Sequence, residues 1–119
     1  MKSEEAERGS ASVLALALIG VLVAVVSAAL VVSGAFVAHR RAAVAADAAA
    51  LAAADAASGR ASGVPCVQAE RLAAVNGARL DSCRARGAVV TVDVSTAYLG
   101  MRSTAEARAG PPGSPAELP

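Results

Sequence analysis

Hydrophobic side chains dominate one uninterrupted stretch near the beginning of the chain. Residues 9–38 contain thirty consecutive positions without a charged side chain, and most of them are Leu, Ile, Val or Ala. The ~30 Å hydrocarbon layer of a bilayer requires ~20 helical residues, and this stretch exceeds that length. It also exceeds the ~7–15 apolar residues of an ordinary secretory signal. The pattern predicts a transmembrane helix over residues 10–38, preceded by a charged leader over residues 1–9.

Alanine fills most of the segment that follows. Alanine is the main residue of residues 39–58, and Leu51 and Asp55 are among the few other side chains in the second half. Because alanine has the highest helix propensity, we expect this segment to be an Ala-rich helical extension. Asp47, Leu51 and Asp55 are four residues apart and therefore lie on one face of that helix. The alternative, a low-complexity segment that simply remains helical, stays open.

Glycine, serine and proline then interrupt the helical pattern. Residues 59–65 form the predicted linker. Residues 67–75 predict a short helix, which the pair Asn76-Gly77 ends because glycine readily adopts the left-handed conformation of a helix C-terminus.

The remaining chain shows the alternation of β-strands. Residues 88–95 alternate between apolar and polar side chains, and residues 103–109 place alanines on one face. We therefore expect a small α+β exported head over residues 66–109, with an antiparallel sheet against helical segments, and a disordered tail over residues 110–119. The predicted fold class is α+β: a single long N-terminal transmembrane helix followed by a small antiparallel-sheet head.

Composition argues against several classes of function. The 119 residues carry a net charge of +1, one Phe, one Tyr and no Trp, so basic patches and stacking platforms for nucleic acid are lacking. The single histidine, His39, follows the apolar stretch directly, where an interfacial role is more common than a catalytic one. No serine has a neighbouring base in the sequence, and there is no glycine-rich phosphate loop. We expect no enzymatic activity, no cofactor, no metal, no nucleic acid and no small-molecule substrate.

Two cysteines, Cys66 and Cys83, follow the apolar stretch. With one histidine in the chain and no CxxC motif, they cannot complete a four-ligand zinc site. In a small exported domain the pair predicts a disulfide, which closes a loop of about 18 residues and contributes ~3 kcal/mol. Two free thiols in a cytosolic domain are the alternative.

The charges that flank the apolar stretch and the two cysteines favour opposite orientations of the chain in the membrane. Arg40 and Arg41 follow the stretch, while Lys2 and Arg8 precede it, so the positive-inside rule weakly favours a cytoplasmic C-terminal side. Whole domains translocate largely regardless of such charges. We therefore follow the cysteines and predict a single-pass cell-membrane protein with a cytoplasmic N-terminus and an extracytoplasmic head.

Small residues recur along the apolar stretch. Gly20, Ala24 and Ala28 are spaced by four, and small residues at this spacing let membrane helices approach closely. We expect this face to pack against a partner helix, although an alanine-rich segment also produces such spacing by chance.

Three short segments resemble a known family: GSASV from Gly9 onwards, ADAAALAAA around Asp47 and Leu51, and an alternating end with ARAGP. Together they resemble the TadE/TadG-like proteins of Flp-type pilus assembly, especially the small actinobacterial helicase/secretion-neighbourhood TadE-like subgroup. The resemblance implies a single-span, pseudopilin-like protein. Its implied partners are membrane lipid and, through the helix, other membrane proteins of a pilus or secretion machine.

The resemblance also marks Gly9 and Ser10 as a prepilin-type cleavage site. Ser10 would then be the first residue of the mature chain, but Leu14 stands where pilins carry a glutamate at the fifth position. This departure implies a non-polymerising assembly component instead of a major pilin. The alternative is that Gly9-Ser10 marks a helix N-terminus, with Ser10 or Ser12 as its cap.

Two other functions remain open from the sequence. Small-residue triplets beginning at Ser27 and Ser33 could serve as signal cleavage sites and release a secreted binding module. Reduced cysteines would instead favour a small membrane regulator with a cytoplasmic tail.

Overall fold

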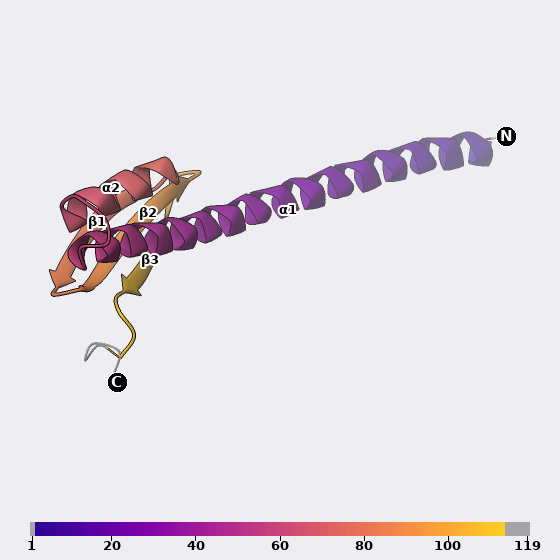
Figure 1. The fold of residues 1–119 in the computed structure, drawn as a ribbon. Coiled ribbons are helices and arrows are strands. Elements are labelled where there is room, and N and C mark those ends of the chain that lie inside the picture. Colours follow the sequence, from indigo (N-terminus) through magenta and orange to yellow (C-terminus); the bar gives the residue numbers. More distant parts are fainter. Residues whose placement is uncertain (1, 114–119) are drawn as a thin grey trace. The chain divides into compact units, whose positions relative to one another are not determined.

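The fold was analysed in a computed structural model, which describes residues 2–113 (Figure 1). A long helix is followed by a short helix and a three-stranded sheet, as the predicted α+β class requires. The chain forms two compact units, Met1–Gly34 and Ala35–Pro119. The elements are α1 (Lys2–Ala57), α2 (Pro65–Val75), β1 (Arg79–Arg86), β2 (Val89–Tyr98) and β3 (Met101–Ala109).

Helix α1 begins earlier than the sequence predicted. It starts at Lys2, so Ser10 and Ser12 lie inside the helix, and the alternative that one of them is an N-terminal cap is wrong. The Ser12 hydroxyl instead donates to the carbonyl oxygen of Arg8 at 3.1 Å, which is how an interior serine satisfies its polar group. The leader therefore continues the helix. Met1 lies outside the described residues.

Helix α2 has clear signals at both ends. Pro65 occupies its first turn, where the missing N–H costs nothing. Gly77 follows its end with φ +73, and the Ala78 N–H donates to the Ala73 carbonyl at 2.9 Å. This left-handed ending confirms the stop predicted at Asn76-Gly77.

The three strands form an antiparallel sheet in the order β1-β2-β3. The β1–β2 turn contains Gly87 with φ +61. The β2–β3 turn consists of Leu99 and Gly100, both with positive φ, as in the two-residue hairpins that match strand twist. This second turn was not predicted, because leucine is unusual in a left-handed conformation. Of the predicted tail, residues 114–119 lie outside the described residues.

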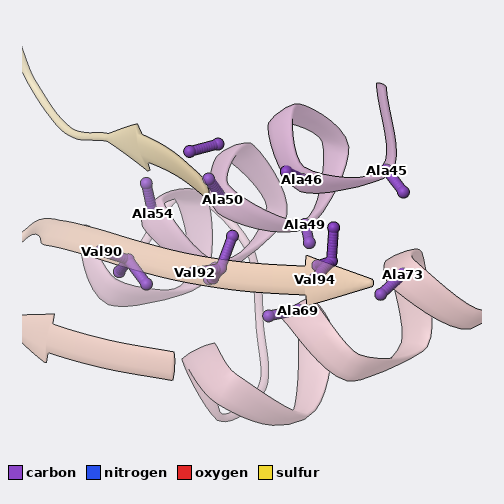
Figure 2. Close-up of a cluster of buried hydrophobic side chains, with 12 residues drawn as sticks. Ala45, Ala46, Ala49, Ala50, Ala54, Ala69, Ala73, Val90, Val92 and Val94 are labelled. Carbon is purple, nitrogen blue, oxygen red and sulfur yellow. The ribbon is translucent and has the colours of Figure 1, made fainter. Parts of the chain in front are cut away.

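The core consists of small side chains from both helices and the sheet (Figure 2). Val90, Val92 and Val94 are the largest fully buried side chains, which confirms the alternation predicted for β2. Small side chains allow the helices to approach the sheet closely. The buried alanines of the same cluster are Ala45, Ala46, Ala49, Ala50, Ala53, Ala54, Ala69, Ala73 and Ala107.

The Ala-rich half of α1 is therefore one wall of the head. Residues 39–58 were predicted to be an extension separate from residues 66–109, whereas the contacts place both in the unit Ala35–Pro119. The reason is that alanines on one helical face complete a core that the head alone is too small to build.

Strand β2 runs against the direction of α1. In Figure 2, Val90 lies near Ala54 and Val94 lies near Ala49, so advancing along β2 means moving back along the helix. The buried Thr96 hydroxyl continues this order and donates to the carbonyl oxygen of Ala38 at 3.0 Å. The end of β2 is thus held beside the part of α1 nearest the apolar stretch.

Candidate functional site: an apolar helix and a disulfide-linked head

The N-terminal unit presents its apolar side chains outwards. Large aliphatic residues from Val13 to Val32 are exposed around the whole helix. This part of α1 is long and apolar enough to cross a membrane by length and composition, and none of its most apolar window is buried. Exposed apolar surface of this extent marks a site of contact with membrane or protein.

The predicted helix-packing residues lie within this unit. Gly20, Ala24 and Ala28 follow one another along one face of α1. A side chain added at Gly20 would meet no other atom within 4 Å, so the fold of this chain does not itself require a glycine there. Packing of this face against another helix stays a prediction.

Residues Gly9 and Ser10 lie within α1, and Leu14 is exposed one turn further on. The local geometry is that of a regular helix, and Gly9 has open space around its Cα. Cleavage after Gly9 stays a prediction.

Asp47 and Leu51 face away from the core that their neighbouring alanines build. Both side chains are exposed, as is Val44 two turns before Leu51. Asp55 is the only acid on this face with an ionic partner among the described residues, Arg60, at 3.9 Å. Packing of the head therefore does not explain the family motif at Asp47 and Leu51, which stays a predicted interaction site.

The two cysteines form the predicted disulfide. Cys66 in the first turn of α2 is bonded to Cys83 in the middle of β1, with a Cα–Cα distance of 5.8 Å. The bond joins α2 to the sheet across a separation of 17 residues. A covalent link of this kind suits a domain whose core contains mostly alanine and valine.

The outer face of the sheet carries a polar network that the sequence analysis missed. Asp81 sits where the β1–β2 register shifts, and its carboxylate lies 2.7 Å from the Arg102 guanidinium. A hydrogen bond from the Ser95 hydroxyl lowers the pKa of Asp81, and Arg102 and Arg79 lower it further, against the opposing effect of burial. The alternation of β2 predicted Ser95 on this face. The β-bulge that brings Asp81 to the same face could not be predicted, because no residue pattern in β1 indicates it.

A second cluster lies further along the same face. Asp93 accepts a hydrogen bond from the Ser82 hydroxyl and pairs with Arg84 at 3.7 Å. Beside it is a shallow polar hollow of about 250 Å³. Its lining contains neither histidine nor cysteine: Arg84, Arg86, Val89, Thr91, Glu106 and Arg108.

Metal-ligating side chains do not gather in the described part of the chain. Among residues 7–113, no three His, Cys, Asp or Glu side chains lie close enough to hold a metal ion. The His39 side chain is exposed. The main features of the described residues are the exposed apolar surface of α1 and the Cys66–Cys83 disulfide.

These features define a protein with an exposed apolar N-terminal helix and a small disulfide-linked α+β head. Residues 9–56 match a family described as "Putative Flp pilus-assembly TadE/G-like". Over these residues the chain is similar to that family, which confirms the resemblance seen in the sequence; the finer subgroup stays a prediction. No curated protein matches the chain. No solved structure matches it either.

Proposed function

We propose that this protein is a single-pass, pseudopilin-like structural or assembly component of a Tad/Flp-type pilus or secretion apparatus. The observation that carries the proposal is that the family match, residues 9–56, coincides with one helix whose N-terminal part exposes its apolar side chains. Apolar surface costs ~25 cal/mol per Å² in water, so insertion in a bilayer is the favourable state of such a helix.

The proposed orientation has the N-terminus in the cytoplasm and the head outside. The Cys66–Cys83 disulfide supports an oxidising compartment for the head. Leu14, in place of a carboxylate, supports an assembly role over that of a major pilin, because no acid is available to neutralise a new N-terminal amine. Other membrane proteins of the machine are the proposed partners of the helix.

Protease added to wall-stripped cells tests the orientation. We expect cleavage in the exposed loop after Ala57, since exposed loops with small residues are preferred sites of proteolysis. The C-terminal fragment contains both cysteines and, because it packs on the alanines of α1, should separate from the helix only when the sample is denatured for electrophoresis. Mass spectrometry of the membrane-bound remainder will show whether the chain begins at Met1 or Ser10. A head that is protected in cells and digested only in inverted vesicles would contradict the proposal.

Crosslinking in native membranes tests the helix as the partner site. Replacing Gly20 and Ala24 together with Leu keeps the helix apolar but prevents close approach of a second backbone. We expect fewer crosslinks to pilus-machine proteins in this double variant. The matched control replaces Val21 and Val25 with Leu on a neighbouring face, and equal losses in both variants would contradict the assignment of the face.

A released head is a second candidate, and one observation favours it. The boundary between the two compact units lies between Gly34 and Ala35, inside the small-residue triplet that begins at Ser33. Cleavage there would leave the second unit whole. A mature N-terminus near Phe36 in the culture medium would establish this secreted form in place of the anchored one.

A further inference from the structure

One end of the head carries exposed apolar side chains that its core does not use. Leu99 and Met101 at the β2–β3 turn are 67% and 54% exposed, and Val75 at the end of α2 is 75% exposed. Val75 belongs to the same end because β1, which starts shortly after it, pairs its first residue with Ser95 near the end of β2. The half-buried Tyr98 adjoins the turn. We call Tyr98, Leu99 and Met101 the hairpin tip.

The hairpin tip lies beyond the level of Ala38. Thr96 is bonded to the Ala38 carbonyl, and β2 at that point is running back along α1 towards Ala35. Leu99 follows Thr96 by three residues, which at ~3.3 Å per residue places it up to about 10 Å further in that direction.

This depth matches the interface of a bilayer. The predicted span of residues 10–38 is ~43 Å long at 1.5 Å per residue, close to the ~40–45 Å of a bilayer with its headgroups. Ala38 then lies at the outer headgroup level. A point ~10 Å deeper lies near the edge of the ~30 Å hydrocarbon layer.

The side chains at this level have the chemistry of an interface. The chain contains one Phe and one Tyr, and both occur here: Phe36 on α1 and Tyr98 at the hairpin tip. Tyrosine concentrates at headgroup level because its ring is apolar while its hydroxyl remains in contact with water, and the Phe36 ring adds apolar surface beside it. Arg41 is also at this end, since its Cδ is 3.5 Å from where a Cβ on Gly77 would lie. Its guanidinium suits a lipid phosphate.

The backbone of Leu99 also needs an explanation. It is the only non-glycine residue with positive φ, at 47°, among residues 2–113. A left-handed leucine costs about 1–2 kcal/mol relative to its usual conformation, and asparagine or glycine would fill the position more easily. Because the side chain is exposed, packing within the head does not compensate for the energy of this strained conformation.

We infer that the hairpin tip docks into the bilayer interface from which α1 emerges, with Leu99 and Met101 inserted among the lipid headgroups and upper chains. The inference rests on the proposed insertion of α1 in the membrane. The lipid surface is the occupant because the hydrogen bond to Ala38 holds the tip at the end of the predicted span, where a bilayer is already present. The head would then be attached to the membrane twice, through the helix and through the tip.

Fluorescence quenching on the full chain tests this contact. Leu99→Cys, Val67→Cys and Val23→Cys are each labelled with a polarity-sensitive dye and placed in phosphatidylcholine–phosphatidylglycerol nanodiscs with spin-labelled lipid. The native disulfide leaves no other free thiol. Val67 is an equally apolar, exposed residue in the first half of α2, and Val23 reports on the span. We expect several-fold stronger quenching at positions 99 and 23 than at position 67.

The outcomes separate the two proposals. Quenching at position 23, with position 99 no more quenched than position 67, overturns docking of the tip and leaves membrane insertion intact. No quenching at position 23 overturns insertion and docking together.

A second variant separates lipid contact from folding. Leu99→Asn suits the left-handed backbone and removes the apolar side chain, so the head should unfold at an equal or higher temperature. A dye at Met101→Cys should nevertheless lose most of its quenching by lipid in this background. Unchanged quenching would overturn the role of Leu99 in docking.

Discussion

Alanines at the contact between α1 and the sheet set how closely the two approach, and enlarging one of them measures this directly. Ala49 has no exposed surface and lies near Val94 in the core (Figure 2). Ala49→Leu adds three carbon atoms between α1 and β2. Neither element can move away easily, because β2 is paired with a strand on each side and α1 is a continuous helix. We expect the substitution to destabilise the head.

The magnitude follows from the cost of overpacking. Extra methylenes in a close-packed core cost typically about 1–3 kcal/mol. A unit of this size has a total stability of roughly 4–13 kcal/mol at ~0.05–0.15 kcal/mol per residue. At ~4–8 °C per kcal/mol, the midpoint of thermal unfolding should fall by about 4–24 °C.

Tyr98 provides the signal, because it is the only tyrosine in a chain without tryptophan. Its fluorescence is followed during thermal unfolding of the full chain in detergent micelles. Ala48→Leu is the control: it makes the same change on the neighbouring, half-buried position and should shift the midpoint little. Equal midpoints for the Ala49 and Ala48 variants would refute the close packing of this helical face.

Three further perturbations probe the head. Cys66→Ser with Cys83→Ser should lower the free energy of unfolding by about 3 kcal/mol in a denaturant titration, as should reductant on the native chain, and no change would show that the bond does not constrain the unfolded state. Asp81→Asn should destabilise the head at neutral pH; because the folded-state pKa of Asp81 is lowered below 3.8, the difference between variant and native chain should shrink as pH falls through and below that value, and a constant difference would contradict the network. Gly110→Ala should lower the melting temperature, since the new Cβ would lie 2.8 Å from the Cγ2 of Val89, and an unchanged value would show that the end of β3 can shift.

The sequence alone determined the features that depend on local pattern. An uncharged apolar run, a segment of strong helix formers and an alternating valine strand each predict their element because propensity and periodicity act over a few residues. The disulfide was also accessible, since the chain holds only two cysteines and its core is small. The helix start was wrong because Ser10 and Ser12 are equally compatible with a helix interior.

Only the tertiary structure decided how these elements meet. It turned one face of the alanine helix into a wall of the head, which the near-uniform composition of residues 39–58 could not indicate. It also placed Asp81 at a bulge beside Arg102 and Ser95. The hydrogen bond from Thr96 to Ala38 joins residues 58 positions apart and holds the hairpin tip beside the end of the apolar stretch. Contacts at such separations are selected by the packing of the whole unit, so no local pattern encodes them.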